Sequence, residues 1–161
     1  MSVDPAPAHP RGHAHAHTDE EVAERIATTL ELLRGAGGRI TTARRAVVTT
    51  LHAGDDHHVT AEDVAAAVQA EHPDVHLSTV YRTLEALEEL DVVARVDLGP
   101  GPAVFHLVDH AHHHLVCTRC GRVEEAAADV VGPLAEVLDA RYGFAAAPHR
   151  LTITGLCRDC R

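Results

Sequence analysis

Four cysteines in two C-x-x-C pairs are the residues whose types and spacing most directly suggest chemistry. Cys117 and Cys120 form the first pair, Cys157 and Cys160 form the second, and together they are all the cysteines of the chain. Two intervening residues let both thiolates of a pair point into one turn, and two such turns supply the four soft ligands of tetrahedral zinc. Four thiolates leave no open coordination position. The spacing therefore predicts a structural zinc site, with local redox motifs or disulfides as the alternatives.

Three consecutive histidines precede the first cysteine pair, with two residues between the last histidine and Cys117. In a strand, His112 and His114 point to one face and His113 points to the other. Glu125 lies on a later segment that could pair with the histidine strand, and His106 lies six residues before His112. Imidazoles with a carboxylate suit Fe, Zn, Ni or Mn. These side chains, apart from His113, therefore predict a second metal site, and solvated histidines at a hinge are the alternative.

The charge of the chain is distributed unevenly. The formal net charge of -10 argues against a protein that coats nucleic acid by bulk charge alone. However, no acidic residue occurs from 32 to 54, and Arg34, Arg39, Arg44 and Arg45 all fall in that window. A local basic face is therefore expected inside an acidic chain.

The termini and apolar runs bear on location. The chain lacks an apolar run of the roughly 18 to 20 residues that span a bilayer, and residues 1–17 lack the apolar core of a signal peptide. The expected location is the cytoplasm, without membrane partners, where thiols stay reduced. Residues 1–17 are rich in Pro, Ala, Gly and His and predict a disordered tail. Its HAHAH run could bind metal, but such a run is more commonly a solvated segment without a specific binding role.

Capping patterns predict three helices that must position these groups. They span about residues 19–34, 42–54 and 60–70, with Thr18, Thr41 or Thr42, and Thr60 as N-caps. The 161 residues have room for one ordinary domain or two small ones. Short capped helices at the start of the chain favour a helical domain there.

A fourth helix covers STVYRTLEALEEL, with Ser78 as its expected N-cap. Ser78, Thr79, Tyr81 and Arg82 cluster at its exposed first turn. Two strand-like segments, VVARVDL and AVFHLV, flank GPGP and predict a hairpin. Helices followed by a hairpin predict a winged helix-turn-helix, whose second helix presents its first turn to the DNA major groove. An ordinary amphipathic surface helix is the alternative.

The last third of the chain predicts a small α+β unit. Strand-like HHLVC and RVEEA are followed by a helix near 129–142 and by the strand-like HRLTITGLC. Its core is poor for its length, so metal and dimer contacts should complete it. The predicted fold is therefore α+β, with a tail over 1–17, a winged-helix DNA-binding domain over 18–107 and a metal-binding dimerisation domain over 108–161. A hinge is expected at about 98–112.

From about residue 19 onwards, several segments in order resemble the ferric uptake regulator (Fur) superfamily of metal-responsive transcriptional repressors. GRITTARR, HHVTAEDV and STVYRTLEALEELDVV resemble its DNA-binding segments, and HHHLVCTRCG and GLCRDC resemble its metal-binding and cysteine motifs. The resemblance implies a homodimeric, metal-activated repressor of double-stranded operator DNA. It implies a winged-helix domain hinged to an α+β dimerisation domain.

The resemblance also implies roles for individual residues. His58 matches the DNA-domain ligand of the regulatory site, His112, His114 and Glu125 match its other ligands, and His106 occupies a hinge position where iron-type members commonly carry Glu. Bound there, Fe²⁺, Zn²⁺ or Ni²⁺ would hold the hinge in the DNA-competent geometry. The DNA-contacting positions of the family match Arg44, Tyr81 and Arg82.

A third metal site of the family could recruit His113 and His149. The position where the family carries an acid for that site falls near Gly132, and the nearby acids are Asp129 and Glu136. Three rival functions remain at this stage. A zinc-dependent hydrolase would use histidines and a metal-bound water, although the chain has no H-E-x-x-H helix. A peroxide-sensing regulator would belong to the same family. A metal-storage or chaperone protein would leave the fourth helix unexplained.

Overall fold

The computed structural model describes residues 18–54, 58–98, 101–108, 112–147 and 151–161. The predicted tail over 1–17 and His149 therefore lie outside the described residues. The chain divides into two compact units. We call the described residues within 18–95 and 103–108 the helical unit, and those within 96–102 and 112–161 the sheet unit. The α+β fold class predicted from the sequence is confirmed.

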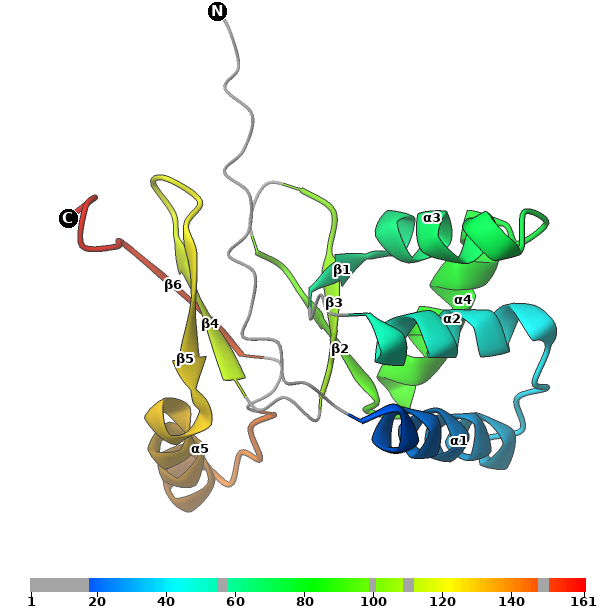
Figure 1. The fold of residues 1–161 in the computed structure, drawn as a ribbon. Coiled ribbons are helices and arrows are strands. Elements are labelled where there is room, and N and C mark those ends of the chain that lie inside the picture. Colours follow the sequence, from blue (N-terminus) through cyan, green and yellow to red (C-terminus); the bar gives the residue numbers. More distant parts are fainter. Residues whose placement is uncertain (1–17, 55–57, 99–100, 109–111, 148–150) are drawn as a thin grey trace, which may run out of the picture. The chain divides into compact units, whose positions relative to one another are not determined.

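The helical unit begins with the three helices that the capping patterns predict. Its helices are α1 (Asp19–Gly35), α2 (Thr42–Ala53), α3 (Ala61–Glu71) and α4 (Leu77–Glu89) (Figure 1). Thr18 and Thr60 each accept a hydrogen bond from the backbone three residues on and complete a capping box. Thr41, the N-cap of α2, accepts from the backbone N–H of Arg44. Each cap satisfies a backbone donor that the first helical turn leaves without an intrahelical partner.

The core of the helical unit sets the rotation of each helix about its axis. On α4 the buried residues are Val80, Thr83, Leu84 and Leu87, which recur every three to four positions. This spacing places them on one face of the helix and leaves the opposite face exposed. Because Val80 and Leu84 are fully buried, the neighbouring Tyr81 is held on the outer face.

The predicted N-cap of α4 was wrong. The helix begins at Leu77, and the N-cap is His76, whose side chain makes no capping hydrogen bond. The backbone carbonyl of His76 accepts from the N–H of Thr79 at 2.8 Å and from that of Val80 at 3.3 Å. Ser78 is therefore the second residue of the helix, and its exposed hydroxyl does not cap the first turn.

A small sheet completes the helical part of the fold. The strands are β1 (Val59–Thr60), β2 (Val93–Val96) and β3 (Val104–Leu107), in the order β1-β3-β2. The pairing of β2 with β3 confirms the predicted hairpin. The sequence did not predict β1, which pairs antiparallel with β3 so that Val59 lies opposite Phe105 and Thr60 opposite Val104.

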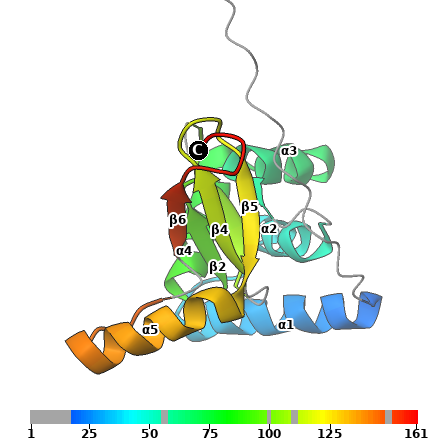
Figure 2. The ribbon, with the colours of Figure 1, turned by 90° about the vertical axis from the view of Figure 1, so that its left-hand side faces the viewer.

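The sheet unit contains three further strands and one helix. They are β4 (His112–Cys117), β5 (Val123–Ala127), α5 (Ala128–Tyr142) and β6 (Thr152–Gly155). The strand order is β5-β4-β6, with β4 antiparallel to β5 and parallel to β6. Figure 2 shows the three strands side by side, with α5 leaving directly from the end of β5. The parallel pair brings the chain segments that follow β4 and β6 to the same end of the sheet.

The sheet unit has a thin apolar core and an apolar helix face. Val131 on α5 is buried, whereas the side chains of Val130, Leu134 and Val137 are 63%, 46% and 44% exposed. Their spacing of four and three residues places these three on one face of α5. Like the other helices in the described part of the chain, α5 lacks the length and apolar character that a membrane crossing requires.

Candidate metal centres and nucleic-acid interface

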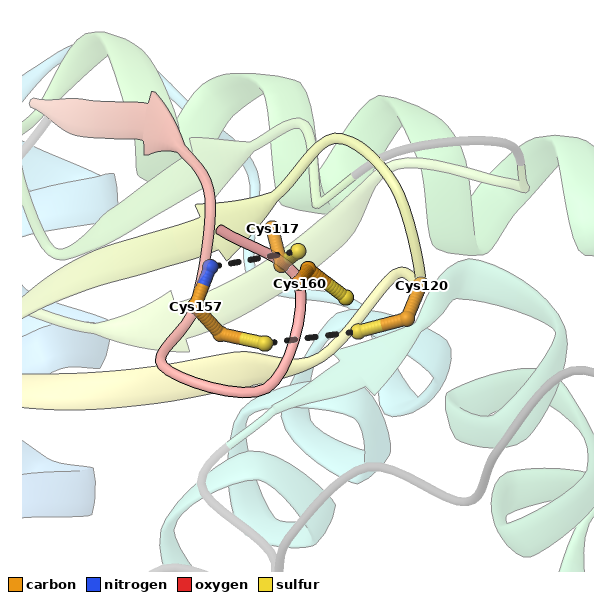
Figure 3. A group of neighbouring side chains, drawn as sticks. All are labelled: Cys117, Cys120, Cys157 and Cys160. Atoms are coloured by element: carbon orange, nitrogen blue, oxygen red, sulfur yellow. Dashed lines mark hydrogen bonds between the residues drawn. The ribbon is translucent and has the colours of Figure 1, made fainter.

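The four cysteine thiols converge between two loops of the sheet unit (Figure 3). Their ligand atoms all lie within 4.8 Å of one another, and the sulfurs of Cys120 and Cys157 are 3.8 Å apart. Four sulfurs at Zn–S distances of about 2.3 Å form a tetrahedron with edges of about 3.8 Å. All four cysteines are free thiols rather than disulfides. The group therefore has the composition and spacing of a structural zinc site.

The parallel pairing of β4 and β6 places these two loops next to each other at one end of the sheet. Cys117 at the end of β4 lies beside Gly155 at the end of β6. Beyond the ladder, the N–H of Thr118 donates to the carbonyl of Gly155 at 2.9 Å, and the N–H of Cys157 donates to the sulfur of Cys117 at 3.4 Å. Gly121 closes the first turn with a positive φ of 74°, which favours glycine. Backbone pairing thus brings the two cysteine loops together.

Two arginines link the first cysteine loop to the second. Arg119 donates from Nη1 to the carbonyl of Cys160 at 2.9 Å. Nη1 of Arg122 lies 2.7 Å from a carboxylate oxygen of Asp159, between the cysteines of the second pair. This hydrogen bond is the main reason that the pKa of Arg122 is raised. The loops are therefore joined by polar contacts in addition to their thiols.

The four thiols do not share one electrostatic environment. Backbone N–H groups, that of Cys157 above all and then that of Cys120, lower the pKa of Cys117 to about 6. Hydrogen bonds with the side chains of Cys157 and Cys120 raise the pKa of Cys160 to about 12. The thiolate is the form of cysteine that ligates a metal. Backbone donors around Cys117 therefore favour the thiolate form that a cation binds.

In the helical unit, two of the predicted regulatory ligands lie together. His58 immediately precedes Val59, and His106 immediately follows Phe105, the partner of Val59 across the β1–β3 ladder. Their ring centroids are 5.7 Å apart with an interplanar angle of 56°. His106 is buried and His58 is half-buried. This arrangement brings two imidazoles close enough to contribute to one cation site.

In the sheet unit, His114 lies directly opposite Glu125 across the β4–β5 ladder. Opposed residues of an antiparallel pair carry their side chains on the same face, about 5 Å apart at Cβ. His114 is only 1% exposed, whereas Glu125 is exposed. His112 lies opposite Ala127 on the same strand, and only its backbone is described. The described regulatory candidates therefore belong to both units: His58 and His106 to the helical unit, and His114 and Glu125 to the sheet unit.

His113 is the histidine of the HHH run that the sequence analysis did not include in the regulatory site. It lies opposite Ala126 and is 2% exposed, and within the described residues neither ring nitrogen has a hydrogen-bond partner. The other predicted ligand of a third site, His149, lies outside the described residues. Gly132 occupies the α5 position where that site expects an acid. The third site stays a prediction.

The predicted DNA-contacting residues of α4 lie on its first two turns. Ser78, Tyr81 and Arg82 are exposed, and Thr79 is half-buried. The carbonyl of Thr79 accepts a hydrogen bond from the hydroxyl of the buried Thr83 at 2.8 Å. The exposed face therefore presents a hydroxyl, a phenol and a guanidinium group to solvent, groups that contact phosphates and base edges in protein–DNA complexes.

Arg44 also has a structural role within the helical unit. Its Nη1 donates to the backbone carbonyl of Arg39 at 3.1 Å. A Cβ atom at Gly38 would lie 2.7 Å from that nitrogen and 2.7 Å from the carbonyl oxygen of Leu33. The absence of a side chain at Gly38 therefore lets the Arg44 guanidinium approach the turn between α1 and α2.

Two polar contacts near these sites were not predicted from the sequence. The hydroxyl of Tyr81 donates to a carboxylate oxygen of Glu62 on α3 at 3.0 Å, and Arg122 contacts Asp159. Each joins residues far apart in the chain. The position of Glu62 within a capping-box turn indicates an exposed helix start, but it does not identify the partner.

Comparisons with known proteins agree with this architecture. The sequence pattern of the Ferric uptake regulator family matches residues 35–154. The chain is 37% identical over 140 residues to the ferric uptake regulation protein of Bacillus subtilis (strain 168), covering 84% of this chain and 94% of that protein.

Two solved structures are also similar. The ferric uptake regulator from Pseudomonas aeruginosa with manganese has a TM-score of 0.66 and 33% sequence identity, covering 81% of this chain and 98% of that one. A zinc uptake regulator complexed with zinc and DNA has a TM-score of 0.58 and 26% identity, covering 89% of this chain and 95% of that one. The chain therefore belongs to the ferric uptake regulator family of metal-responsive transcriptional regulators.

Proposed function

We propose that the chain is a homodimeric, metal-dependent repressor that binds double-stranded operator DNA through the exposed face of α4. The observation that carries this proposal is the distribution of ligand-type side chains over both units. His58 lies beside His106 in the helical unit, and His114 lies opposite Glu125 in the sheet unit. Together with His112, these residues would bind Fe²⁺, Zn²⁺ or Ni²⁺ and so fix the angle between the units.

Ligands drawn from two units make binding selective for one arrangement of those units. A cation shifts a conformational equilibrium only by its differential affinity for the two states. A shift from 1:99 to 99:1 requires about 10⁴-fold tighter binding to the favoured state. Either pair alone offers two ligands, whereas both pairs together offer enough ligands for a complete coordination shell. The arrangement that unites them would therefore be the one that metal stabilises.

The ligand types bear on which metal is sensed. His106 stands where iron-type relatives commonly carry a carboxylate, so the proposed site is rich in nitrogen. Imidazole ligands suit iron, zinc and nickel better than hard cations such as magnesium or calcium. The cysteine group serves a different purpose in this proposal. Four thiolates close the coordination shell of zinc, so that site would stabilise the sheet unit without responding to metal supply.

The charge of the helical unit supports DNA as the partner. The segment from 32 to 54 contains Arg34, Arg39, Arg44 and Arg45 and no acidic residue. Phosphate contacts depend on local positive charge, which this acid-free segment supplies despite the net charge of -10. The similar zinc uptake regulator was solved with zinc and DNA. On this proposal the chain works in the cytoplasm and catalyses no reaction.

The apolar face of α5 supports a second copy of the chain as the other partner. Val130, Leu134 and Val137 are exposed on one face of that helix. Burying such side chains against their equivalents in a second chain would stabilise a dimer by about 25 cal/mol per Å² of apolar surface. A dimer would also place two copies of α4 on one operator, as two-fold symmetric regulators require.

Anaerobic metal titration of DNA binding tests the proposal. Protein with its cysteine-bound zinc intact is titrated with Fe(II), Zn(II), Ni(II) and Mn(II), and binding to a duplex selected from a random pool is followed by fluorescence anisotropy. We expect at least one metal to increase affinity for the selected duplex about tenfold or more. Failure of every metal to increase affinity for any selected duplex would contradict the proposal.

A further inference from the structure

The hydroxyl of Tyr81 on α4 donates a hydrogen bond to Oε1 of Glu62 on α3 at 3.0 Å. Both side chains are exposed, and they lie on the part of the helical unit that presents the first turns of α3 and α4. A hydrogen bond to an ionised acceptor is stronger than one between neutral groups. The contact therefore restrains a side chain that solvent would otherwise leave to sample several rotamers.

The carboxylate stands on a rigid turn. Glu62 is the second residue of α3, whose first turn is fixed by the capping box of Thr60 and Asp63. Its neighbours Ala61 and Val64 are each 1% exposed and pack into the core of the helical unit. An acidic side chain in the first turn is also stabilised by the helix dipole. Glu62 therefore has a fixed backbone from which to reach Tyr81.

The phenol stands on an equally rigid turn. Val80 and Leu84, which flank Tyr81 along α4, are fully buried, as is Thr83. The backbone position of Tyr81 is thus set by the core, and only its two side-chain torsions remain to be set. The hydrogen bond to Glu62 is the largest cause of the raised pKa of Tyr81, while the positive charge of Arg95 acts in the opposite direction. The phenol is therefore held as a protonated donor.

A carboxylate beside a DNA-contacting side chain needs an explanation. Phosphates repel it, so its charge alone lowers affinity for every duplex, whatever the sequence. Its benefit must come from something other than phosphate attraction. Because the Tyr81 hydroxyl donates its hydrogen bond to Glu62, the apolar ring of Tyr81 remains available for contact with base edges such as the thymine methyl group. A ring held in one orientation distinguishes base sequences better than a ring that rotates.

We propose that Glu62 is a positioning residue for sequence recognition, which orients the ring of Tyr81 towards a base edge by accepting its hydroxyl proton in a hydrogen bond. The inference rests on the proposed function, because it requires α4 to meet DNA. Glu62 increases discrimination between duplexes and slightly decreases affinity for all of them. These two effects separate the positioning role from a mere surface charge.

Four variants test this role. The metal-loaded wild type, Glu62→Gln, Glu62→Ala, Tyr81→Phe and the double variant Glu62→Ala/Tyr81→Phe are each titrated with a selected duplex and with a scrambled one. Glutamine retains an acceptor without the charge, so Glu62→Gln should keep the wild-type ratio of the two affinities. Glu62→Ala and Tyr81→Phe should each lower that ratio about fivefold, which is the factor that corresponds to loss of one ordinary hydrogen bond.

The double variant and the wild type make the outcome decisive. If the two side chains act through one contact, the double variant should lose no more discrimination than either single variant. Equal behaviour of Glu62→Gln and Glu62→Ala would overturn the inference, because charge alone would then explain the effect. If the wild type discriminates but Glu62→Ala matches it, the inference fails and the proposed function stands. If none of the tested metals makes the wild type distinguish the selected duplex from the scrambled one, the proposed function fails and the inference fails with it. Thermal unfolding checks each variant, and Tyr81→Phe and Glu62→Gln carry the test if Glu62→Ala does not fold.

Discussion

Nη1 of Arg122 lies 2.7 Å from Oδ2 of Asp159, which joins the residue just before β5 to a residue between the two cysteines of the second pair. The same nitrogen lies 3.9 Å from a carboxylate oxygen of Glu124. The side chains of Arg122, Glu124 and Asp159 are about half exposed. Exposed ion pairs contribute only about 0 to 1 kcal/mol and are screened by salt. We therefore expect the Arg122–Asp159 ion pair to change the rate at which the two cysteine loops separate more than it changes the equilibrium between joined and separated loops.

Removal of the Asp159 carboxylate should accelerate metal loss. Asp159→Asn should release zinc to a colorimetric chelator about two- to fivefold faster than the wild type at low salt, in line with the small energy of an exposed pair. Glu124→Gln is the matched control and should release zinc at nearly the wild-type rate. High salt should remove the difference. Equal rates for Asp159→Asn and the wild type at low salt would show that the ion pair does not restrain the loops.

Removal of the His114 imidazole should separate the two metal sites. His114→Ala should abolish metal-dependent DNA binding while one zinc per chain remains, because the cysteine group does not include this residue. Elemental analysis measures the zinc, and anisotropy measures the DNA binding. His72→Ala removes a half-buried histidine at the C-cap of α3 and should leave both properties unchanged. Loss of the zinc from folded His114→Ala would contradict the division into two sites.

A charge on the apolar face of α5 should weaken self-association. Leu134→Glu places a carboxylate between Val130 and Val137, and burial of an unpaired charge is strongly unfavourable. We expect the dimer dissociation constant to rise about tenfold or more, as measured by sedimentation equilibrium. Glu136→Lys changes an exposed charge two residues further along, on the opposite side of the helix, and should preserve the dimer. Unchanged association of Leu134→Glu would place the interface elsewhere.

The contact between Tyr81 and Glu62 should be visible by titration. The chain has two tyrosines and no tryptophan, so in a Tyr142→Phe background the tyrosinate absorbance reports Tyr81 alone. Its pKa should lie above the ordinary value of 10.0, and Glu62→Ala should lower it. Only the protonated phenol donates, so this contact stabilises the fold below about pH 10 and is lost as pH rises through the raised pKa. A midpoint that does not change in Glu62→Ala would show that the contact is absent in solution.

Local rules explain which parts of the fold were predictable. Thr18, Thr41 and Thr60 cap their helices through side chains that contact backbone only three residues away, so a short window of sequence contains the whole interaction. His76 caps α4 through its backbone alone, and the sequence therefore gives no signal at that residue. Strand β1 has two residues, too few for an alternating pattern to be recognised.

Chemistry rather than proximity made the cysteine group predictable. Ligand type and C-x-x-C spacing identify a zinc site wherever the chain folds, and the four thiols do come together. The contacts of Glu62 with Tyr81 and of Arg122 with Asp159 join residues on separate elements. They depend on how α3 packs against α4 and on how β6 pairs with β4, which no short window of sequence specifies.

The parallel pairing of β4 with β6 also leads us to expect an order of assembly for the sheet unit. Strands β4 and β5 can form a hairpin through the turn that contains Cys120, whereas β6 must return past the whole of α5 before it pairs. Closing the longer loop costs more chain entropy, and non-local pairing is slow. We expect a refolding chain to pass through a species with a formed hairpin and only half of its zinc ligands. Zinc capture would then complete the assembly of this unit rather than begin it.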